Sequence, residues 1–199
     1  MKISFKTFSK GSGSILTRDE IRTDELPLQY VQEKDGIRLV CIGKILQSLE
    51  GCACPMGALS REFLKRLRLR ESEMVLIDTE AGVEHFGRGV ETSVDSVLIV
   101  VEPSLDSLEL AEKINTLASQ VGIGEKVWAI LNKIPSDELK SKLMDDLAGR
   151  NVKVIGTIEY DPDIFLASLE GRPPDGDKPK REMKRILDAL LEDEGREDR

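Results

Sequence analysis

The sequence predicts an α/β fold of three layers, in which helices cover both faces of a mainly parallel sheet. Short apolar runs alternate along the chain with segments whose apolar residues recur every three or four positions. Runs without polar alternation are typical of strands buried on both faces, and the longer periodicity is typical of amphipathic helices. Their alternation indicates a parallel sheet that binds ligands where its strands end.

Five apolar runs are the predicted strands, near residues 37–42, 74–78, 97–101, 127–131 and 152–158. The Asp35-Gly36 pair before the first run is a strong turn signal. Trp128 is expected to pack under a helix rather than against a ligand. The expected core includes Val75, Leu76, Ile77, Leu98, Ile99, Val100, Ala129, Ile130 and Val154.

Helical periodicity covers residues 59–69, 107–121, 137–147 and 181–191. A stretch rich in proline and glycine, residues 171–179, precedes the last of these and is typical of a linker. We therefore expect three parts: an irregular segment 1–35, an α/β domain 36–170, and a linker with a C-terminal helix and charged tail, 171–199.

Composition excludes several classes of protein. The 199 residues are 40% hydrophobic and 33% charged, and the formal net charge of −8 argues against broad binding to nucleic acid or to an anionic membrane. No apolar run approaches the roughly 20 residues that span a bilayer, and no signal peptide is evident, so a cytoplasmic location is expected. Three cysteines do not suggest a disulfide framework there, and the single histidine, His85, excludes a histidine-rich catalytic metal site.

Polar residues follow two of the predicted strands. Asp78 comes at the end of one run, the position of a Walker B acid that holds Mg²⁺ through water. Gly82 follows shortly after it, where a switch-loop amide can sense a terminal phosphate. The alternative is that Asp78 caps a turn. Asn132 and Lys133 follow another run, and an asparagine amide there can pair with a purine edge because it offers a donor and an acceptor; Asn-Lys is equally a common start of a loop.

Cys52 and Cys54 form a CxC pair just before a predicted helix, and two thiolates suit a soft metal such as Zn²⁺ or Ni²⁺. A closed tetrahedral site needs four ligands, which two chains about a twofold axis would supply. The alternative is a pair of free, partly buried thiols. Cys41 lies inside an apolar run and is expected in the core. His85 is expected to orient the loop that follows Asp78, and the alternative is a metal ligand or proton shuttle.

A phosphate cradle of the GxxxxGK[ST] type does not occur in the sequence. The nearest stretch, residues 9–14, has a lysine and two glycines but lacks the Gly-Lys-Thr that would follow. The lysine that reaches the β- and γ-phosphates and the hydroxyl that holds Mg²⁺ are therefore missing from the motif.

Taken together, these residues resemble the CooC-type ATPases, MinD/ParA-like proteins with a deviant Walker A motif that help to insert nickel into carbon monoxide dehydrogenase. The resemblance covers about residues 20–170 and is carried by GCACP (51–55), VLIDTEAGVEHFGRG (75–89), VEPS (101–104) and LNK (131–133). It implies a P-loop-NTPase-like fold of the SIMIBI/MinD type, Mg-ATP hydrolysis and nucleotide-dependent dimerisation.

The resemblance also implies roles for individual residues. Cys52 and Cys54 would hold a metal between protomers, Asp78 would be the Walker B acid and Gly82 the switch-loop amide. Asn132, with Lys133 beside it, would contact the adenine of ATP or ADP. A further segment would close over the base: Glu159, Tyr160 and Asp161.

Members of that family begin with a strand, a KGG-x-GK-[ST] loop, a helix and a second strand. We expect this chain to lack that N-terminal strand–helix portion and to be impaired in ATP hydrolysis. The predicted function is a nucleotide-linked accessory role in nickel insertion, as a homodimer, with carbon monoxide dehydrogenase or a separate P-loop chain as partner. The alternative is a non-enzymatic metal-binding, scaffold or regulatory protein that keeps a CxC-bridged dimer.

Overall fold

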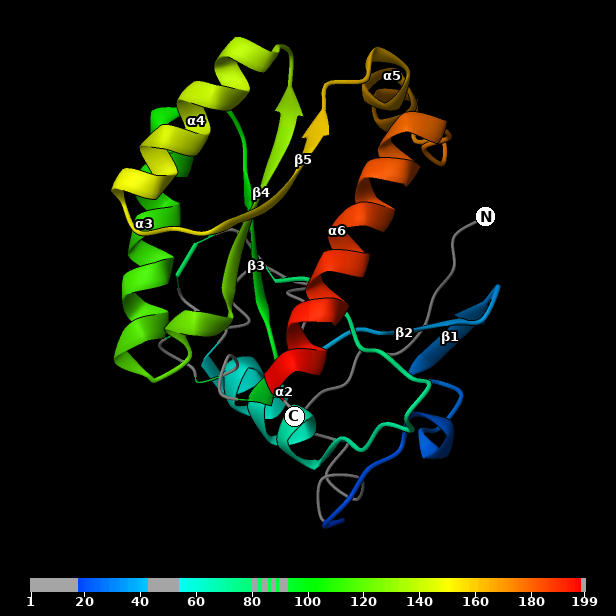
Figure 1. The fold of residues 1–199 in the computed structure, drawn as a ribbon. Coiled ribbons are helices and arrows are strands. Elements are labelled where there is room, and N and C mark those ends of the chain that lie inside the picture. The colour runs from blue at the N-terminus through cyan, green and yellow to red at the C-terminus, as the bar shows by residue number, and fades with distance from the viewer. Residues whose placement is uncertain are drawn as a thin grey trace. The chain divides into compact units, whose positions relative to one another are not determined.

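The computed structural model describes residues 18–42, 54–79, 82–83, 86, 89 and 93–197. The chain divides into two compact units, Met1–Ser93 and Val94–Arg199, and each is described by itself (Figure 1). The domain boundaries expected at residues 35 and 170 stay a prediction. In the described part of the chain, no helix is both long enough and apolar enough to cross a membrane.

The elements with given bounds in the described part of the first unit are a hairpin, a short 3-10 helix and an α-helix. Its elements are η2 (Thr23–Glu25), β1 (Val31–Lys34), β2 (Ile37–Val40) and α2 (Cys54–Arg66). Strands β1 and β2 pair antiparallel, with Lys34 opposite Ile37. The turn residues Asp35 and Gly36 have φ values of 52° and 79°, the left-handed backbone that matches the twist of a two-residue hairpin. The turn predicted at this position is confirmed.

A small apolar cluster holds this unit together. Ile21, Leu26 and Phe63 are buried, so the residues on both sides of η2 and the apolar side of α2 share one core. Backbone hydrogen bonds join the same parts: the Ile21 amide donates to Arg66 O at 2.8 Å, and the Arg68 amide donates to Ile21 O at 2.9 Å.

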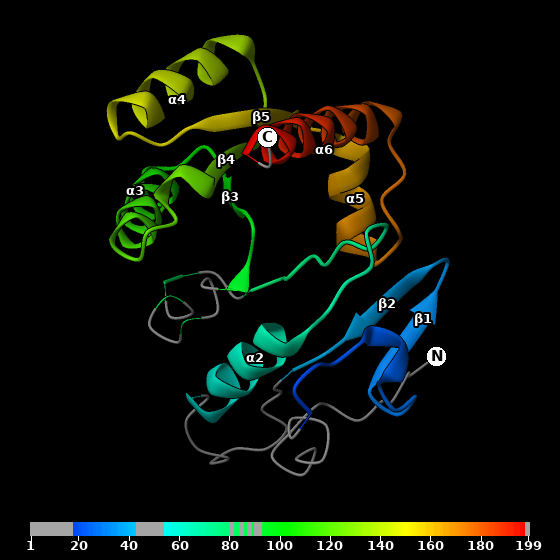
Figure 2. The same ribbon diagram turned by 60° about the horizontal axis from the view of Figure 1, so that its bottom comes forward.

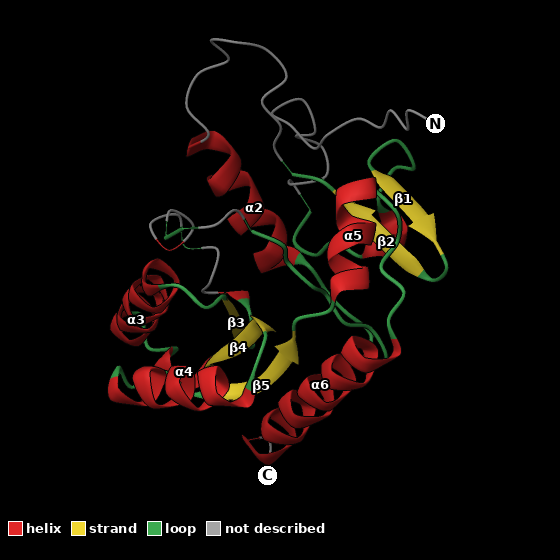
Figure 3. Cartoon of the chain, turned by 90° about the horizontal axis from the view of Figure 1, so that it is seen from above, coloured by secondary structure: helices red, strands yellow, loops and turns green. Residues whose placement is uncertain are grey.

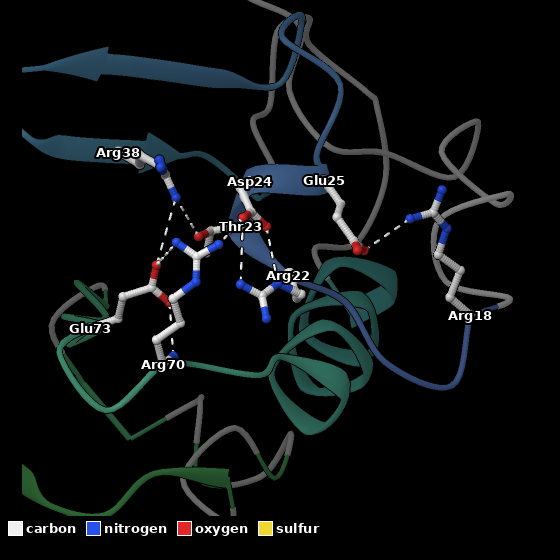
Figure 4. Close-up of polar contacts among 8 residues, drawn as sticks. All are labelled: Arg18, Arg22, Thr23, Asp24, Glu25, Arg38, Arg70 and Glu73. Carbon is white, nitrogen blue, oxygen red and sulfur yellow. Dashed lines mark hydrogen bonds and ion pairs between the residues drawn. The ribbon is translucent and has the colours of Figure 1, made fainter.

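Charged side chains add a network at the surface of the first unit (Figure 4). Arg22 donates to Asp24 at 3.2 Å, and Arg70, which lies beyond α2, also pairs with Asp24. The hydrogen bond from Arg22 lowers the pKa of Asp24 below its usual value. Arg38 of β2 lies 3.9 Å from Glu73, so the network links η2, the hairpin and the segment after α2.

The second unit contains a sheet flanked by helices. Its elements are β3 (Val97–Val101), α3 (Leu105–Gln120), η5 (Gly124–Lys126), β4 (Val127–Ile134), α4 (Asp137–Gly149), β5 (Val154–Glu159), α5 (Pro162–Glu170) and α6 (Asp177–Glu197). The three strands are parallel in the order β3-β4-β5. The register runs from Val97 opposite Val127 to Val101 opposite Leu131.

Helices cover both faces of this sheet. Figures 1 and 2 show α3 and α4 on one face and α6 on the other, over β5. The view in Figure 3 shows the same three layers. Gly156 of β5 lies directly beneath Ile186 of α6, whose side chain is 3% exposed. The predicted three-layer α/β class is confirmed.

Two of the five predicted strands differ from expectation. Residues 37–40 form a strand, but it belongs to the hairpin of the first unit and not to the parallel sheet. Residues 73–79 have no regular structure, and Leu76 is 84% exposed. The prediction that this run is a strand is wrong for this structure, because a strand needs a neighbour to satisfy its backbone groups and none of the described residues pairs with it.

Other differences concern burial and boundaries. Val75, Leu76 and Val100 are exposed rather than in the core; Val100 is 58% exposed because no described helix covers that face of β3. Strand β4 continues three residues past the expected end, to Ile134. Helix α5 is not among the expected helices, and α6 begins at Asp177, inside the expected linker.

Candidate functional site

The polar residues that follow β3, β4 and β5 share one edge of the second unit's sheet, because parallel strands end on the same side. Glu102 follows β3, Asn132 and Lys133 lie near the end of β4, and Tyr160 follows β5. We call this group the carboxyl edge. It brings together the residues predicted to contact a nucleotide base.

A bulge in β4 places Asn132 and Lys133. Leu131 pairs with Thr157 and Ile134 pairs with Glu159, so β4 has one more residue than β5 between these two pairs. Lys133 takes up the extra length in a left-handed conformation, with φ of 58°. For a residue other than glycine this costs about 1 kcal/mol. Bulges turn side chains away from the regular alternation and recur beside functional sites.

Lys133 is held from the neighbouring strand. Its Nζ lies 2.6 Å from Glu102 Oε1, and both side chains are about half exposed. The backbone amide of Glu102 also faces the hydroxyl of Ser107, at 3.4 Å. The pair therefore crosses from the end of β3 to the bulge of β4, beside the half-buried Asn132.

The end of β5 completes the edge. The Tyr160 amide donates to Ile134 O at 2.9 Å, which continues the β4–β5 ladder past the bulge. The Tyr160 ring is 46% exposed and lies 6.3 Å from the ring of Phe165, centroid to centroid. The side chain of Asp161 caps α5, because its Oδ1 accepts hydrogen bonds from the amides of Asp163 (2.9 Å) and Ile164 (3.1 Å).

Glu159 is engaged with α6. Its carboxylate accepts a hydrogen bond from Lys178, and that bond raises the pKa of Lys178 above its usual value. The Glu159 amide donates to Glu182 Oε2 at 3.1 Å. Of the residues predicted to close over the base, Glu159 and Asp161 thus already have partners in the described structure, and Tyr160 presents an exposed ring.

The charges on this edge disfavour a phosphate. The first turns of α3, α4 and α5 point here, but Ser104, Ser136 and Asp161 already cap them. Acidic residues also occupy these first turns: Asp106, Asp137, Glu138 and Asp163. An anion would be repelled, whereas an uncharged purine next to an amide and an aromatic ring would not.

Asp78 and Gly82 belong to the first unit. Asp78 is exposed, directly after the irregular run that replaces the expected strand. Gly82 has φ of 120°, a backbone conformation available to glycine but strained for residues with a side chain. Their Mg²⁺ and phosphate roles stay predictions.

The cysteine prediction lies largely outside the described residues. Cys52 and His85 are among those not described, and of Cys54 only the backbone is described, as the first residue of α2. Cys41 is a free cysteine and is half-buried, not fully in the core. Over the described ranges, no group of three or more His, Cys, Asp and Glu side chains is placed to hold a metal ion.

Glu102 is a residue of the edge to which sequence reasoning gives no role. The signal was present, because Glu102 follows an apolar run just as Asp78 and Asn132 do. Its pairing with Lys133 depends on strand order, which one sequence does not specify.

No family model matches the sequence. Relatives are clear nonetheless. An ATP-binding protein of Methanocaldococcus jannaschii is 42% identical over 175 residues, which cover 88% of this chain and 68% of the relative. Among the solved structures, a ParA family ATPase from Chlorobium tepidum matches 96% of this chain and 76% of its own, with a TM-score of 0.59 and 18% identity. The chain belongs to the family of this ATP-binding protein, and its fold is that of the ParA family ATPase.

Two further relatives are similar to this chain over most of its length. A second ATP-binding protein of M. jannaschii is 34% identical over 85% of the chain. The carbon monoxide dehydrogenase accessory protein CooC of Rhodospirillum rubrum is 37% identical over 75% of the chain. The chain spans 66% and 56% of these two relatives. The family assignment agrees with the predicted resemblance, and the fold likeness confirms the predicted architecture.

Proposed function

We propose that this chain is a CooC-type member of the family and acts as a nucleotide-linked accessory protein in nickel insertion into carbon monoxide dehydrogenase, in the cytoplasm. The observation that carries the proposal is the 37% identity to CooC over three quarters of the chain, in a sequence that contains a CxC pair. Carbon monoxide dehydrogenase, a second copy of this chain and a separate P-loop chain are the proposed partners.

The carboxyl edge is the proposed site for the adenine base. The Asn132 amide offers a donor and an acceptor to the adenine N6/N7 edge, and the exposed Tyr160 ring offers a stacking surface. The acidic helix starts nearby fit an uncharged base and not its phosphates. We place the Mg²⁺ and phosphate contacts at Asp78 and Gly82. Because no GxxxxGK[ST] occurs in these 199 residues, hydrolysis by this chain alone is expected to be impaired.

The CxC pair is the proposed metal site, with nickel as cargo and zinc as a competitor. Thiolates are the ligands that soft metals prefer. Two ligands per chain leave a tetrahedral site half complete, so the proposal requires a homodimer.

Nucleotide binding is tested by isothermal titration of the full chain with Mg-ATP and with Mg-ADP. Binding is expected for wild type and weakened about tenfold or more in Asn132→Ala, which removes the paired donor and acceptor. Gln120→Ala removes an exposed amide at the end of α3 and is the matched control. Absence of binding to wild type, alone and with a P-loop partner, would refute the nucleotide-linked role.

Metal binding is tested by titration with Ni²⁺ and Zn²⁺ while the oligomeric state is followed by light scattering. The Cys52→Ser/Cys54→Ser variant is expected to lose both the metal and the dimer. Cys41→Ser, which removes the free cysteine next to β2, should lose neither. A double variant with unchanged metal content and unchanged mass rules out the CxC site.

The alternative, a non-enzymatic scaffold or regulator with a CxC-bridged dimer, is not favoured. Two of the relatives are named as ATP-binding proteins, and a scaffold would not need the amide and aromatic groups gathered at the carboxyl edge. If the Cys52→Ser/Cys54→Ser variant loses the dimer while the wild type binds no nucleotide, the scaffold or regulator would be the preferred function.

A further inference from the structure

We propose that Glu102 sets the base preference of the carboxyl edge by holding the Lys133 ammonium in an ion pair, which makes the site select adenine over guanine. This inference rests on the proposed function, because it assigns specificity to the proposed base site. It concerns Glu102, which touches no base itself and acts through Lys133.

The chemistry of the two purines separates Asn132 from Lys133. On its N6/N7 side adenine presents one donor and one acceptor, which an amide matches with both of its groups. Guanine presents two acceptors there, O6 and N7, and these suit a group with donors alone, such as a lysine ammonium. Asn132 and Lys133 are adjacent in the chain, so the site contains the group for each base.

The β4 bulge explains why the groups that suit adenine and guanine both occur at the carboxyl edge. In a regular strand, consecutive side chains point to opposite faces of the sheet. At the β4 bulge the extra residue and the left-handed Lys133 break that alternation, at the end of the strand where the edge residues gather. Without a restraint, the ammonium would be available to any base that reaches Asn132.

Glu102 supplies the restraint. Its Oε1 lies 2.6 Å from Lys133 Nζ, within charge-assisted hydrogen-bond distance, and it approaches from the neighbouring strand β3. The ammonium keeps two other N–H donors, but the pair fixes its position at the end of β3, so a guanine could use it beside Asn132 only by drawing it away from the carboxylate towards a neutral carbonyl oxygen, which is a weaker acceptor. An adenine leaves the pair intact and uses the Asn132 amide alone.

The test compares the affinities of the full chain for Mg-GTP and Mg-ATP by isothermal titration. In Glu102→Gln, the ratio of GTP affinity to ATP affinity is expected to rise about tenfold, the scale of one hydrogen bond to a charged donor. The matched control is Glu125→Gln, which breaks the Glu125–Lys153 ion pair at the opposite, amino end of β4 and β5. It should leave the ratio unchanged.

A double-mutant cycle separates specificity from simple stabilisation of the edge. In the Lys133→Met background, Glu102→Gln is expected to leave the ratio unchanged, because the ammonium that it would release is gone. A shift of the same size in that background overturns the proposal. If Glu102→Gln fails to fold by circular dichroism, Glu102→Asp, which keeps the charge and lengthens the pair, should shift the ratio in the same direction by less; an unchanged ratio overturns the proposal.

The outcomes also distinguish the two proposals. Wild type that binds neither nucleotide refutes the base site and its specificity together. Wild type that binds ATP, with a ratio unaffected by Glu102→Gln, leaves the base site standing and refutes the role of Glu102.

Discussion

Adding one methyl group at Gly156 tests how α6 packs on the sheet. A Cβ at this position would overlap Ile186 Cγ1 and lie 3.0 Å from Ile186 Cδ1. Ile186 is 3% exposed and belongs to α6, so it has little room to move unless the helix shifts away from β5. We expect Gly156→Ala to destabilise the second unit by about 1–3 kcal/mol, the usual cost of overpacking a closed site.

Tryptophan fluorescence in urea is the assay, because Trp128 of β4 is the sole tryptophan of the chain and reports on the second unit. Gly149→Ala is the matched control: a Cβ there meets nothing within 4 Å, and the residue lies in α4. The control is expected to be neutral or to stabilise by up to about 1 kcal/mol, because alanine favours a helix over glycine.

Ile186→Ala completes the test, since it removes the side chain that the new methyl group would strike. Alone it should cost about 2–5 kcal/mol, as a cavity forms. Combined with Gly156→Ala the cost should be less than the sum, with a coupling of about 0.5–3 kcal/mol, because each change relieves the other. Stability of Gly156→Ala equal to that of wild type, or strict additivity in the double variant, would refute close packing of α6 on Gly156.

Three further predictions concern capping and titration. Asp161→Ala removes the cap of α5 and should destabilise the second unit by about 1 kcal/mol in the same fluorescence assay, while Asp161→Asn should restore most of it. In a carboxyl ¹³C NMR titration, Asp24 should show a pKa below its usual value, and Arg22→Ala should raise it; the stabilisation is present above the usual pKa and is lost as the pH falls through the lowered one. Lys178 should show a raised pKa that Glu159→Gln lowers; here the stabilisation is present at neutral pH and is lost as the pH rises through the raised pKa, and an unchanged pKa would contradict the pair.

The sequence predicted the sheet of the second unit well, because strands buried by helices on both faces are apolar without interruption. Residues 97–101 and 127–131 are both apolar without interruption and both are strands, although β3 keeps one exposed position at Val100. Met74 to Ile77 is apolar in the same way but is not a strand. The difference is the presence of a neighbour, which is a property of the whole fold and not of a run of four residues.

Helix α5 has clear sequence signals at its two ends but none in its interior. Asp161 and Pro162 are a preferred N-cap and first helical residue, and Gly171 ends the helix with φ of 67°. The helix itself is short and mostly apolar, so it lacks the alternation of polar and apolar residues by which the other helices were predicted.

For the candidate site, sequence reasoning identified Asn132, Lys133 and Tyr160 by their position after apolar runs. It could not place Glu102 beside Lys133, because that pair depends on β3 and β4 being neighbours. It also ended β4 at Leu131, since a left-handed lysine inside a strand has no local sequence signal.

The continuation of β4 beyond Lys133 limits how this region can vary in evolution or by design. Ile134 is 2% exposed and accepts a hydrogen bond from the Tyr160 amide, so the backbone is anchored on both sides of the extra residue. Deleting one residue would turn Ile134 toward the other face and break that anchor. Substitutions at positions 132 and 133 can therefore alter what is recognised, whereas insertions and deletions there would disturb the interior of the protein.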